Sequence, residues 1–428
     1  MTDQTLHPLS STDSGRATHA LIIGGGMAGL FAARVLSDTF DHVTIVDRDR
    51  LSDKPEARQG VPQAHHPHTL MVRGQDILEQ HFPGLTAELI AHGALPIDAS
   101  REVAFYVAGK WRTPTRHADT MSIAMSRPLL EATIYRRVAA NPRVEIIHAH
   151  DATRLAVDAE RQRVTGVYVR DRAGSPSAEK RLTANLVLDA SGRFSRVPQW
   201  LQQLGYEPPA EITVNAFTGY STRLYQRPAD FAEDWQAMYI RPTLPTGPRG
   251  GMIMPVEGNR WIVALIGMNG DFPPTDEAGF MEFARSLPTP RLYEVIRQAE
   301  PLDKPIGYRR TENRLRRYDQ LPRYLEGLLV YGDAVCALNP VHAHGITAAA
   351  LGSLALSDSL QSHFANHAAG SVDGLAAAFQ EQLGQSLAGL WHSISNEDRR
   401  WPKAEVTTGE QLRSTRGPRA GTLAAALS

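Results

Sequence analysis

The 428-residue sequence has a single cysteine, Cys336, and no long apolar run. One cysteine excludes an internal disulfide, and it also excludes metal or iron–sulfur sites that are built from several cysteines. No segment approaches the roughly 20 apolar residues that a membrane-spanning helix requires, and the first residues lack an apolar stretch of signal-peptide length. These absences predict a cytoplasmic protein without stable membrane insertion.

An excess of one charge is also missing. The formal net charge is −1 and no block of like charges occurs, so nucleic acid is not predicted as a partner. A metal site needs three or four converging ligands, and nothing in the sequence brings the histidines together in that way. No metal is therefore predicted. The histidine clusters are His65–His68, His148–His150 and His342–His344.

A glycine-rich motif follows the first apolar segment. Gly24, Gly26 and Gly29 form G-x-G-x-x-G directly after the predicted strand 21–23, and they open a predicted helix. In this motif the glycines allow a tight turn, close approach of a pyrophosphate, and packing of helix on strand. The next predicted strand ends in Asp47, at the distance expected for a carboxylate that binds a ribose. The pattern predicts binding of a dinucleotide.

A second strand–turn–helix segment indicates which dinucleotide. The predicted strand 328–331 runs into Gly332 and Asp333, and Gly345 then opens another helix. A carboxylate at a strand end can bind the hydroxyls of a sugar-like chain, and a helix N-terminus stabilises negative charge on a ring. FAD has a ribityl chain and such a ring, whereas NAD has neither. We therefore predict FAD.

Three motifs together resemble those of the FAD-dependent monooxygenase superfamily that includes the aromatic hydroxylases. They are GGGMAG, DASGRFSR and GDAVCALNPVHAHG. Four further segments are similar to those of the flavin epoxidases of polyether antibiotic biosynthesis, namely RQGVPQAHHPHTL, YSTRLY, GNRWIVALIG and NRLRRYDQLP. The likeness extends from about residue 18 to about residue 360.

The resemblance implies roles for individual residues. It assigns Asp47 to the adenosine ribose and Asp333 to the ribityl chain, and it places Pro340 and Gly345 beside the flavin ring. Arginine suits phosphate geometry, so Arg58 and Arg127 are candidate pyrophosphate contacts, with a surface ion pair as the alternative. Further candidate cofactor contacts are Met27, Ala28 and Arg48, and the middle motif contributes Asp189, Gly192, Ser195 and Arg196, of which Asp189 could instead form a strand-end turn.

The predicted fold class is α/β, a doubly wound, Rossmann-like FAD-binding domain with an inserted strand-rich substrate domain. Residues 18–204 would form the first part of the FAD-binding domain, 205–305 the substrate-binding region, 306–400 the second part with a C-terminal helix, and 401–428 a tail of low periodicity. In the inserted region TVNAFTGYSTRLY, GMIMPV and RWIVALIGM are strand-like, and EGN reads as a turn.

The function implied is insertion of one oxygen atom of O2 into an apolar small molecule, by epoxidation or hydroxylation through a flavin C4a-hydroperoxide. The electrons would come from NADH or NADPH, directly or through a separate flavin reductase, because no second G-x-G-x-x-G is present. Candidate substrate contacts are Tyr220, Met252, Met254 and Trp261, with ordinary sheet core as the alternative, and His344 is the candidate catalytic residue. A reductase of prenyl-type double bonds, a flavin halogenase and a non-catalytic flavoprotein remain open.

Overall fold

A parallel five-stranded sheet forms the centre of the larger part of the molecule. The computed structural model describes residues 18–112, 121–173, 178–368 and 370–409. The strand order is β19-β11-β1-β2-β7, and every neighbouring pair is parallel. The strands are β1 (His19–Ile23), β2 (His42–Val46), β7 (Val144–Ile147), β11 (Leu186–Asp189) and β19 (Leu328–Val330). Because both faces of such a sheet are covered, the strands are almost entirely apolar.

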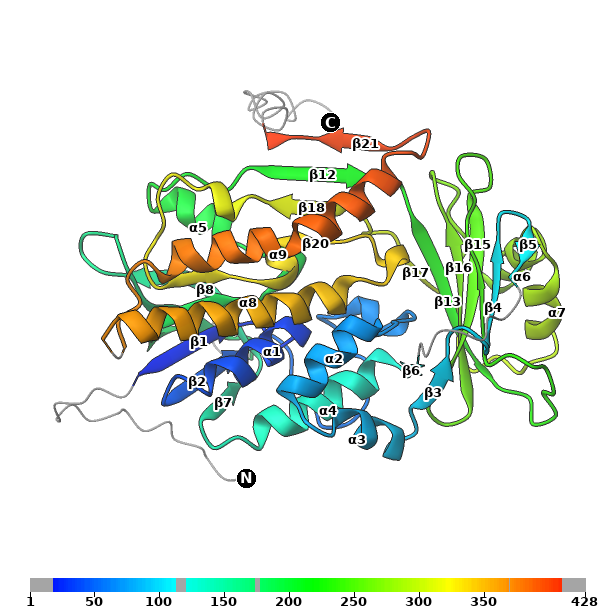
Figure 1. Ribbon diagram of the computed structural model, residues 1–428, viewed down its shortest axis with the longest axis horizontal. Helices are drawn as coiled ribbons and strands as arrows, with labels where there is room; N and C mark the ends of the chain where they lie inside the picture. Colours follow the sequence, from blue (N-terminus) through cyan, green and yellow to red (C-terminus); the bar gives the residue numbers. More distant parts are fainter. Residues whose placement is uncertain (1–17, 113–120, 174–177, 369, 410–428) are drawn as a thin grey trace, which may run out of the picture.

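Helices cover one face of this sheet and a small antiparallel sheet covers the other. Helix α8 packs against α1, α2 and α9 (Figure 1), and β9 packs on β11. The helices are α1 (Met27–Leu36), α2 (Val72–His81), α3 (Leu85–Ala91), α4 (Arg127–Ala139), α5 (Val197–Gln203), α8 (Gly345–Asn366) and α9 (Leu375–Asp398). The small sheet consists of β8 (His150–Val157), β9 (Val164–Asp171) and β10 (Glu179–Thr183). Among the described residues, no helix is long and apolar enough to cross a membrane.

A seven-stranded sheet forms the second part of the molecule, which stands at the right of Figure 1. Its order is β17-β13-β16-β15-β14-β4-β5. The strands are β4 (Val103–Val107), β5 (Lys110–Trp111), β13 (Gly219–Gln226), β14 (Ala237–Ile240), β15 (Arg249–Val256), β16 (Arg260–Gly267) and β17 (Ile306–Tyr308). Helices α6 (Glu277–Arg285) and α7 (Arg291–Ile296) cover its outer face. The parallel sheet and this strand-rich second sheet confirm the predicted α/β class.

Two features differ from the simple pattern that the sequence predicts. The segment 213–225 is two strands rather than one, because the backbone turns at Phe217, whose φ is +49°. Its first half, β12 (Glu211–Asn215), joins β18 (Asn313–Arg316), β20 (Cys336–Ala337) and β21 (Glu405–Thr407). Strands β4 and β5 come from the region that we assigned to the FAD-binding part, yet they pair into the seven-stranded sheet. Within the predicted tail, β21 pairs with β12, and residues 410–428 lie outside the described chain.

A short ribbon links the two parts. Strand β3 (Leu95–Asp98), which follows α3, pairs antiparallel with β6 (Met121–Ala124), which precedes α4. The turn predicted at EGN connects β15 to β16, with Gly258 and Asn259 at positive φ.

Candidate cofactor and substrate cavity

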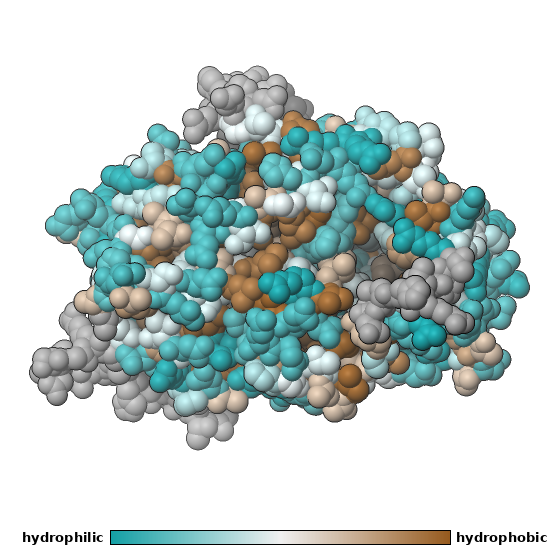
Figure 2. Space-filling model, in the orientation of Figure 1, coloured by the Kyte–Doolittle hydropathy of each residue, from teal (hydrophilic) through white to brown (hydrophobic). Residues whose placement is uncertain are grey.

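One large cavity lies between the glycine-rich end of the parallel sheet and the inner face of the seven-stranded sheet. Its volume is 1180 Å³. This exceeds the roughly 300–1,000 Å³ that is typical of a pocket for one drug-sized ligand. Met71 lines the cavity and is 38% exposed, so an apolar part of the lining reaches the surface just before α2. Figure 2 shows apolar residues gathered near the middle of one face of the molecule. The cavity has room for a dinucleotide and a second molecule.

The three motif glycines have different surroundings. A Cβ on Gly24 would lie 2.7 Å from the carbonyl oxygen of Ala190, and one on Gly29 would lie 1.8 Å from that of Gly24. Gly26 instead faces open space, because a Cβ there would meet only a guanidinium nitrogen of Arg58, at 3.8 Å. Gly24 and Gly26 line the cavity, as do Met27 and Ala28, whereas Gly29 does not. Gly29 therefore serves packing of α1 on the turn and not cofactor contact.

The acidic and basic residues of this end form one buried ion cluster. The Asp47 carboxylate accepts a hydrogen bond from the backbone N–H of Gly25 at 2.5 Å and pairs with Arg58 at 3.2 Å. Arg58 also pairs with Glu131 at 2.7 Å, and Arg127 pairs with the same carboxylate at 3.0 Å. Asp47, Arg48, Arg58 and Arg127 all line the cavity. The predicted phosphate contacts are thus ion-paired, and they lie half-buried along the cavity beside the glycine turn.

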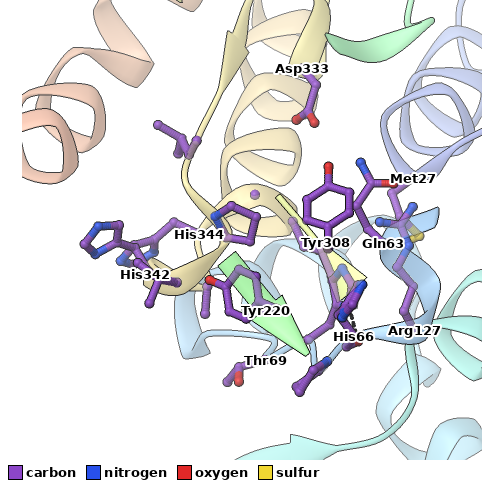
Figure 3. Close-up of a pocket in the computed structure, with 18 of the residues that line it drawn as sticks. Met27, Gln63, His66, Thr69, Arg127, Tyr220, Tyr308, Asp333, His342 and His344 are labelled. Carbon is purple, nitrogen blue, oxygen red and sulfur yellow. Dashed lines mark hydrogen bonds between the residues drawn. The ribbon is translucent and has the colours of Figure 1, made fainter. Parts of the chain in front are cut away.

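Asp333 also lines the cavity, but it does not belong to this ion cluster. Its carboxylate lines the cavity and makes no hydrogen bond or ion pair with the described residues. Burial raises the pKa of Asp333, although Arg193 and Arg127 oppose the shift. In Figure 3 the ring of Tyr308 lies between Asp333 and Tyr220. An unpaired carboxylate in such a place is costly unless a bound molecule supplies a hydrogen-bond donor.

The loop before α8 borders the same cavity. Pro340, His344 and Gly345 line it, and a Cβ on Gly345 would meet nothing within 4 Å. At the start of the helix, Nδ1 of His344 and Oγ1 of Thr347 are buried and have no hydrogen-bond partner. Burial lowers the pKa of His344, and His342 adds to the shift. Of these two residues, His344 lines the cavity, so its Nδ1 is the unsatisfied side-chain group at this end of the helix that a bound molecule could pair.

The middle motif divides into cavity-lining and internal residues. Gly192 and Arg196 line the cavity. Asp189 is fully buried and accepts hydrogen bonds from Oγ of Ser195 at 2.5 Å and from the backbone N–H of Ser191 at 3.0 Å. Asp189 and Ser195 do not line the cavity, which favours the strand-end turn for Asp189.

These residues fit FAD. The open space at Gly26 and Gly345, the unpaired Asp333 and the unsatisfied start of α8 lie along one cavity. A dinucleotide with a sugar-like chain and an anionic ring would fill that space and pair those groups.

The predicted substrate contacts lie on two faces of the second sheet. Tyr220, Met252 and Met254 line the cavity, but Trp261 does not. Trp261 is fully buried on the outer face, where its ring lies 4.8 Å from that of Phe231. The expectation for Trp261 was wrong because side chains alternate along a strand. Met254 pairs with Ile262, so the neighbouring Trp261 must point the other way.

A stability comparison tests this assignment. Trp261→Ala would leave a sealed void in the outer core and is expected to cost about 3–5 kcal/mol. Met252→Ala is expected to cost clearly less, because Met252 is only half-buried and borders the cavity. Urea denaturation of both apoproteins measures the difference. Equal losses would contradict the placement of the two side chains on opposite faces.

The sequence alone assigned no role to two residues that line the cavity, His66 and Tyr308. His66 is 7% exposed, and its Nδ1 lies 2.8 Å from Oγ1 of Thr222, while Nε2 has no partner. Burial lowers the pKa of His66 to about 4, so the ring is neutral at neutral pH. The ring of Tyr308 lies 5.4 Å from it. The histidine-rich segment 65–68 is the sequence feature that could have indicated a role for His66. Only the fold shows which of its rings points into the cavity.

Comparison with known proteins identifies the family. A family model described as FAD binding domain matches residues 17–376. Protein Rv3254 of Mycobacterium tuberculosis (strain ATCC 25618 / H37Rv) is 32% identical over 339 residues, which span 78% of this chain and 71% of that protein. The chain belongs to the FAD binding domain family, and it is an FAD-dependent oxidoreductase.

Solved structures share the fold. The myxobacterial chondrochloren halogenase CndH has a TM-score of 0.64 at 16% identity, covering 88% of this chain and 81% of that chain. The flavin-dependent brominase Bmp2 has a TM-score of 0.63 at 15% identity, with 89% of each chain covered. PqsL of Pseudomonas aeruginosa in complex with 2-aminobenzoylacetate has a TM-score of 0.61 at 17% identity, covering 90% and 98%. At these identities the likeness concerns the fold.

Proposed function

We propose that this protein is an FAD-dependent monooxygenase that inserts one oxygen atom of O2 into an apolar organic substrate. The observation that carries the proposal is the single cavity, which joins the dinucleotide motifs at one end to an apolar sheet face at the other. One of the structural neighbours, PqsL, is named a "probable FAD-dependent monooxygenase". The finer expectation of epoxidation rests on the motif resemblance to polyether epoxidases.

Bound FAD would supply the electron transfer and the reaction with O2. The protein would orient the substrate and exclude water from the site. Met252, Met254 and Ile266 present apolar surface to the cavity. Burial raises the pKa of Tyr239 to about 12, and it also raises the pKa of Tyr220, so both remain neutral phenols. These apolar and neutral side chains exclude water and favour an apolar substrate.

A halogenase is the alternative that the structural neighbours suggest. A flavin halogenase would need a catalytic lysine beside its substrate. In the described part of the chain, no lysine lines the cavity. The lining therefore favours oxygen insertion over halogenation.

The source of electrons is part of the proposal. The sequence has no second dinucleotide motif, so NADH or NADPH would reach the cofactor transiently, or a separate flavin reductase would deliver the electrons. Oxygen consumption with NADH and with NADPH, each with and without an added flavin reductase, distinguishes these routes.

Labelled oxygen tests the proposed reaction. We expect one 18O atom from 18O2 in the product when the FAD-loaded protein is supplied with electrons and a panel of polyenes and phenols. Mass spectrometry of the products measures the label, and a label in an epoxide would support the finer proposal. The same panel under N2 is the control. A saturated product formed without oxygen would instead favour a reductase of double bonds, and absence of label from every product would contradict the proposal.

A further inference from the structure

A buried carboxylate stands behind the loop that precedes α8. Asp398, the last residue of α9, is 0% exposed. Its Oδ2 accepts hydrogen bonds from the side-chain amides of Asn313 at 2.6 Å and Asn339 at 2.8 Å. Its Oδ1 lies 2.8 Å from Nε2 of His342. A buried carboxylate is costly unless it is well hydrogen-bonded and paired. Of its described partners, His342 is the only one that can carry charge.

This contact fixes the orientation of His342. Ionised Asp398 can only accept hydrogen bonds, so Nε2 of His342 carries a hydrogen and donates it. Nδ1 makes no hydrogen bond with the described residues, and 13% of the side chain remains exposed. His342 lines the cavity, and Figure 3 shows it beside His344 at the α8 end. One ring nitrogen is held by the carboxylate, which leaves the other ring nitrogen available for a further hydrogen bond.

The other histidines that line the described cavity lack this arrangement. They are His66, His68, His150 and His344, and none has an acidic partner among the described residues. Burial lowers the pKa of His66 to about 4 and that of His68 to about 3, so both rings stay neutral. His342 is the cavity histidine whose second proton would be balanced by a carboxylate.

We propose that His342, held by Asp398, is the proton donor of the cavity, and that it donates one of the protons that the reduction of O2 consumes. The inference rests on the proposed reaction with O2. That reaction takes one O2, two electrons from NADH or NADPH and two protons, and it yields one oxygenated product and one water. Nδ1 of His342 supplies one of these protons and regains it from solvent, while Asp398 balances the charge of the doubly protonated ring.

A conservative substitution separates proton donation from loop support. His342→Gln keeps an N–H that can donate to Asp398 but cannot release a proton at neutral pH. The probe is reoxidation of the FAD-loaded, photoreduced protein by O2 alone. Starting from the anionic reduced flavin, this reaction takes up one proton for each O2 that becomes hydrogen peroxide. We expect this reoxidation to slow by roughly 100-fold in His342→Gln, as removal of a general acid does. FAD affinity, measured by titration of the apoprotein, is expected to stay unchanged.

Imidazole provides the second readout. In His342→Ala, imidazole in the buffer is expected to restore much of the lost rate, because it can occupy the vacated space and donate a proton. His363→Ala is the matched control, since His363 is a buried histidine of α8 that does not line the cavity and bonds the backbone of Ser371. Its reoxidation should match the wild type with or without imidazole.

Two results would overturn the inference. One is a wild-type reoxidation rate in His342→Gln, and the other is a slow His342→Ala that imidazole does not rescue. Failure of the proposed function is separate from both, because it shows as unlabelled products in the 18O2 experiment while reoxidation by O2 still depends on His342.

Discussion

Gly29→Ala is expected to prevent folding of the protein. The Cβ of an alanine would lie 1.8 Å from the carbonyl oxygen of Gly24, a backbone atom that cannot rotate away. Ordinary overpacking of a core costs about 1–3 kcal/mol, and a backbone clash of this depth has to move α1 from the sheet. Because domains of this kind are stable by only about 5–15 kcal/mol, we expect little soluble protein, and what remains should lack a cooperative melting transition by circular dichroism.

Gly26→Ala is the matched control, three residues earlier in the same turn. Its Cβ would meet only the Arg58 guanidinium, at 3.8 Å, and the φ of −75° suits any residue. The apoprotein should therefore melt near the wild-type temperature. FAD affinity should nevertheless fall steeply, because the added methyl group occupies space where the pyrophosphate approaches the backbone. A folded Gly29→Ala, or a Gly26→Ala that binds FAD normally, would refute these separate roles of the two glycines.

The cofactor end could be predicted from the sequence because its signals are local. Gly24, Gly26 and Asp47 lie within one strand–turn–helix–strand unit, where spacing along the chain sets spacing in the fold. The structure places all three along the cavity, with Gly26 and Asp47 beside Arg58. Gly29 belongs to the same motif, but its role is packing, which the spacing alone does not separate from contact with a ligand.

The substrate end could not be predicted to the same depth. Trp261 and Met254 both lie in strand-like segments, and both read as cavity candidates. Which face each occupies depends on the register between β15 and β16, and a shift of one residue reverses every side chain. The Asp398–His342 pair joins residues 56 positions apart. Such a contact depends on how α9 packs on the loop before α8, and no local pattern reports it.

Asp333→Asn is expected to stabilise the apoprotein while it weakens FAD binding. The carboxylate is buried beside the cavity and has no hydrogen bond or ion pair with the described residues. A neutral amide avoids the cost of that unpaired charge. With FAD present, we expect the wild-type carboxylate to gain a charge-assisted hydrogen bond to the ribityl chain, worth roughly 1.5–3 kcal/mol. The dissociation constant for FAD should therefore rise on the order of tenfold or more in the variant.

Asp47→Asn is the comparison, and we expect the opposite sign for the apoprotein. Asp47 accepts hydrogen bonds from the backbone N–H groups of Gly25 and Asp49 and pairs with Arg58. Its loss should lower apoprotein stability as well as FAD affinity. Urea denaturation of the apoproteins and FAD titration measure the two effects separately. If both variants destabilise the apoprotein alike, the Asp333 carboxylate already has a structural partner in the apoprotein and is not left unpaired for the cofactor.

The pH dependence provides the decisive check on Asp333. Burial raises the pKa of Asp333 in the folded apoprotein above its unfolded value of about 3.9. A raised pKa in an acid means that the folded state binds the proton more tightly than the unfolded state does. The group therefore costs no stability below the unfolded pKa, and the cost grows as the pH rises from the unfolded pKa to the folded pKa. The advantage of Asp333→Asn over the wild-type apoprotein should accordingly grow as the pH rises towards the folded pKa and shrink on acidification. An advantage that is independent of pH would show that charge is not its cause.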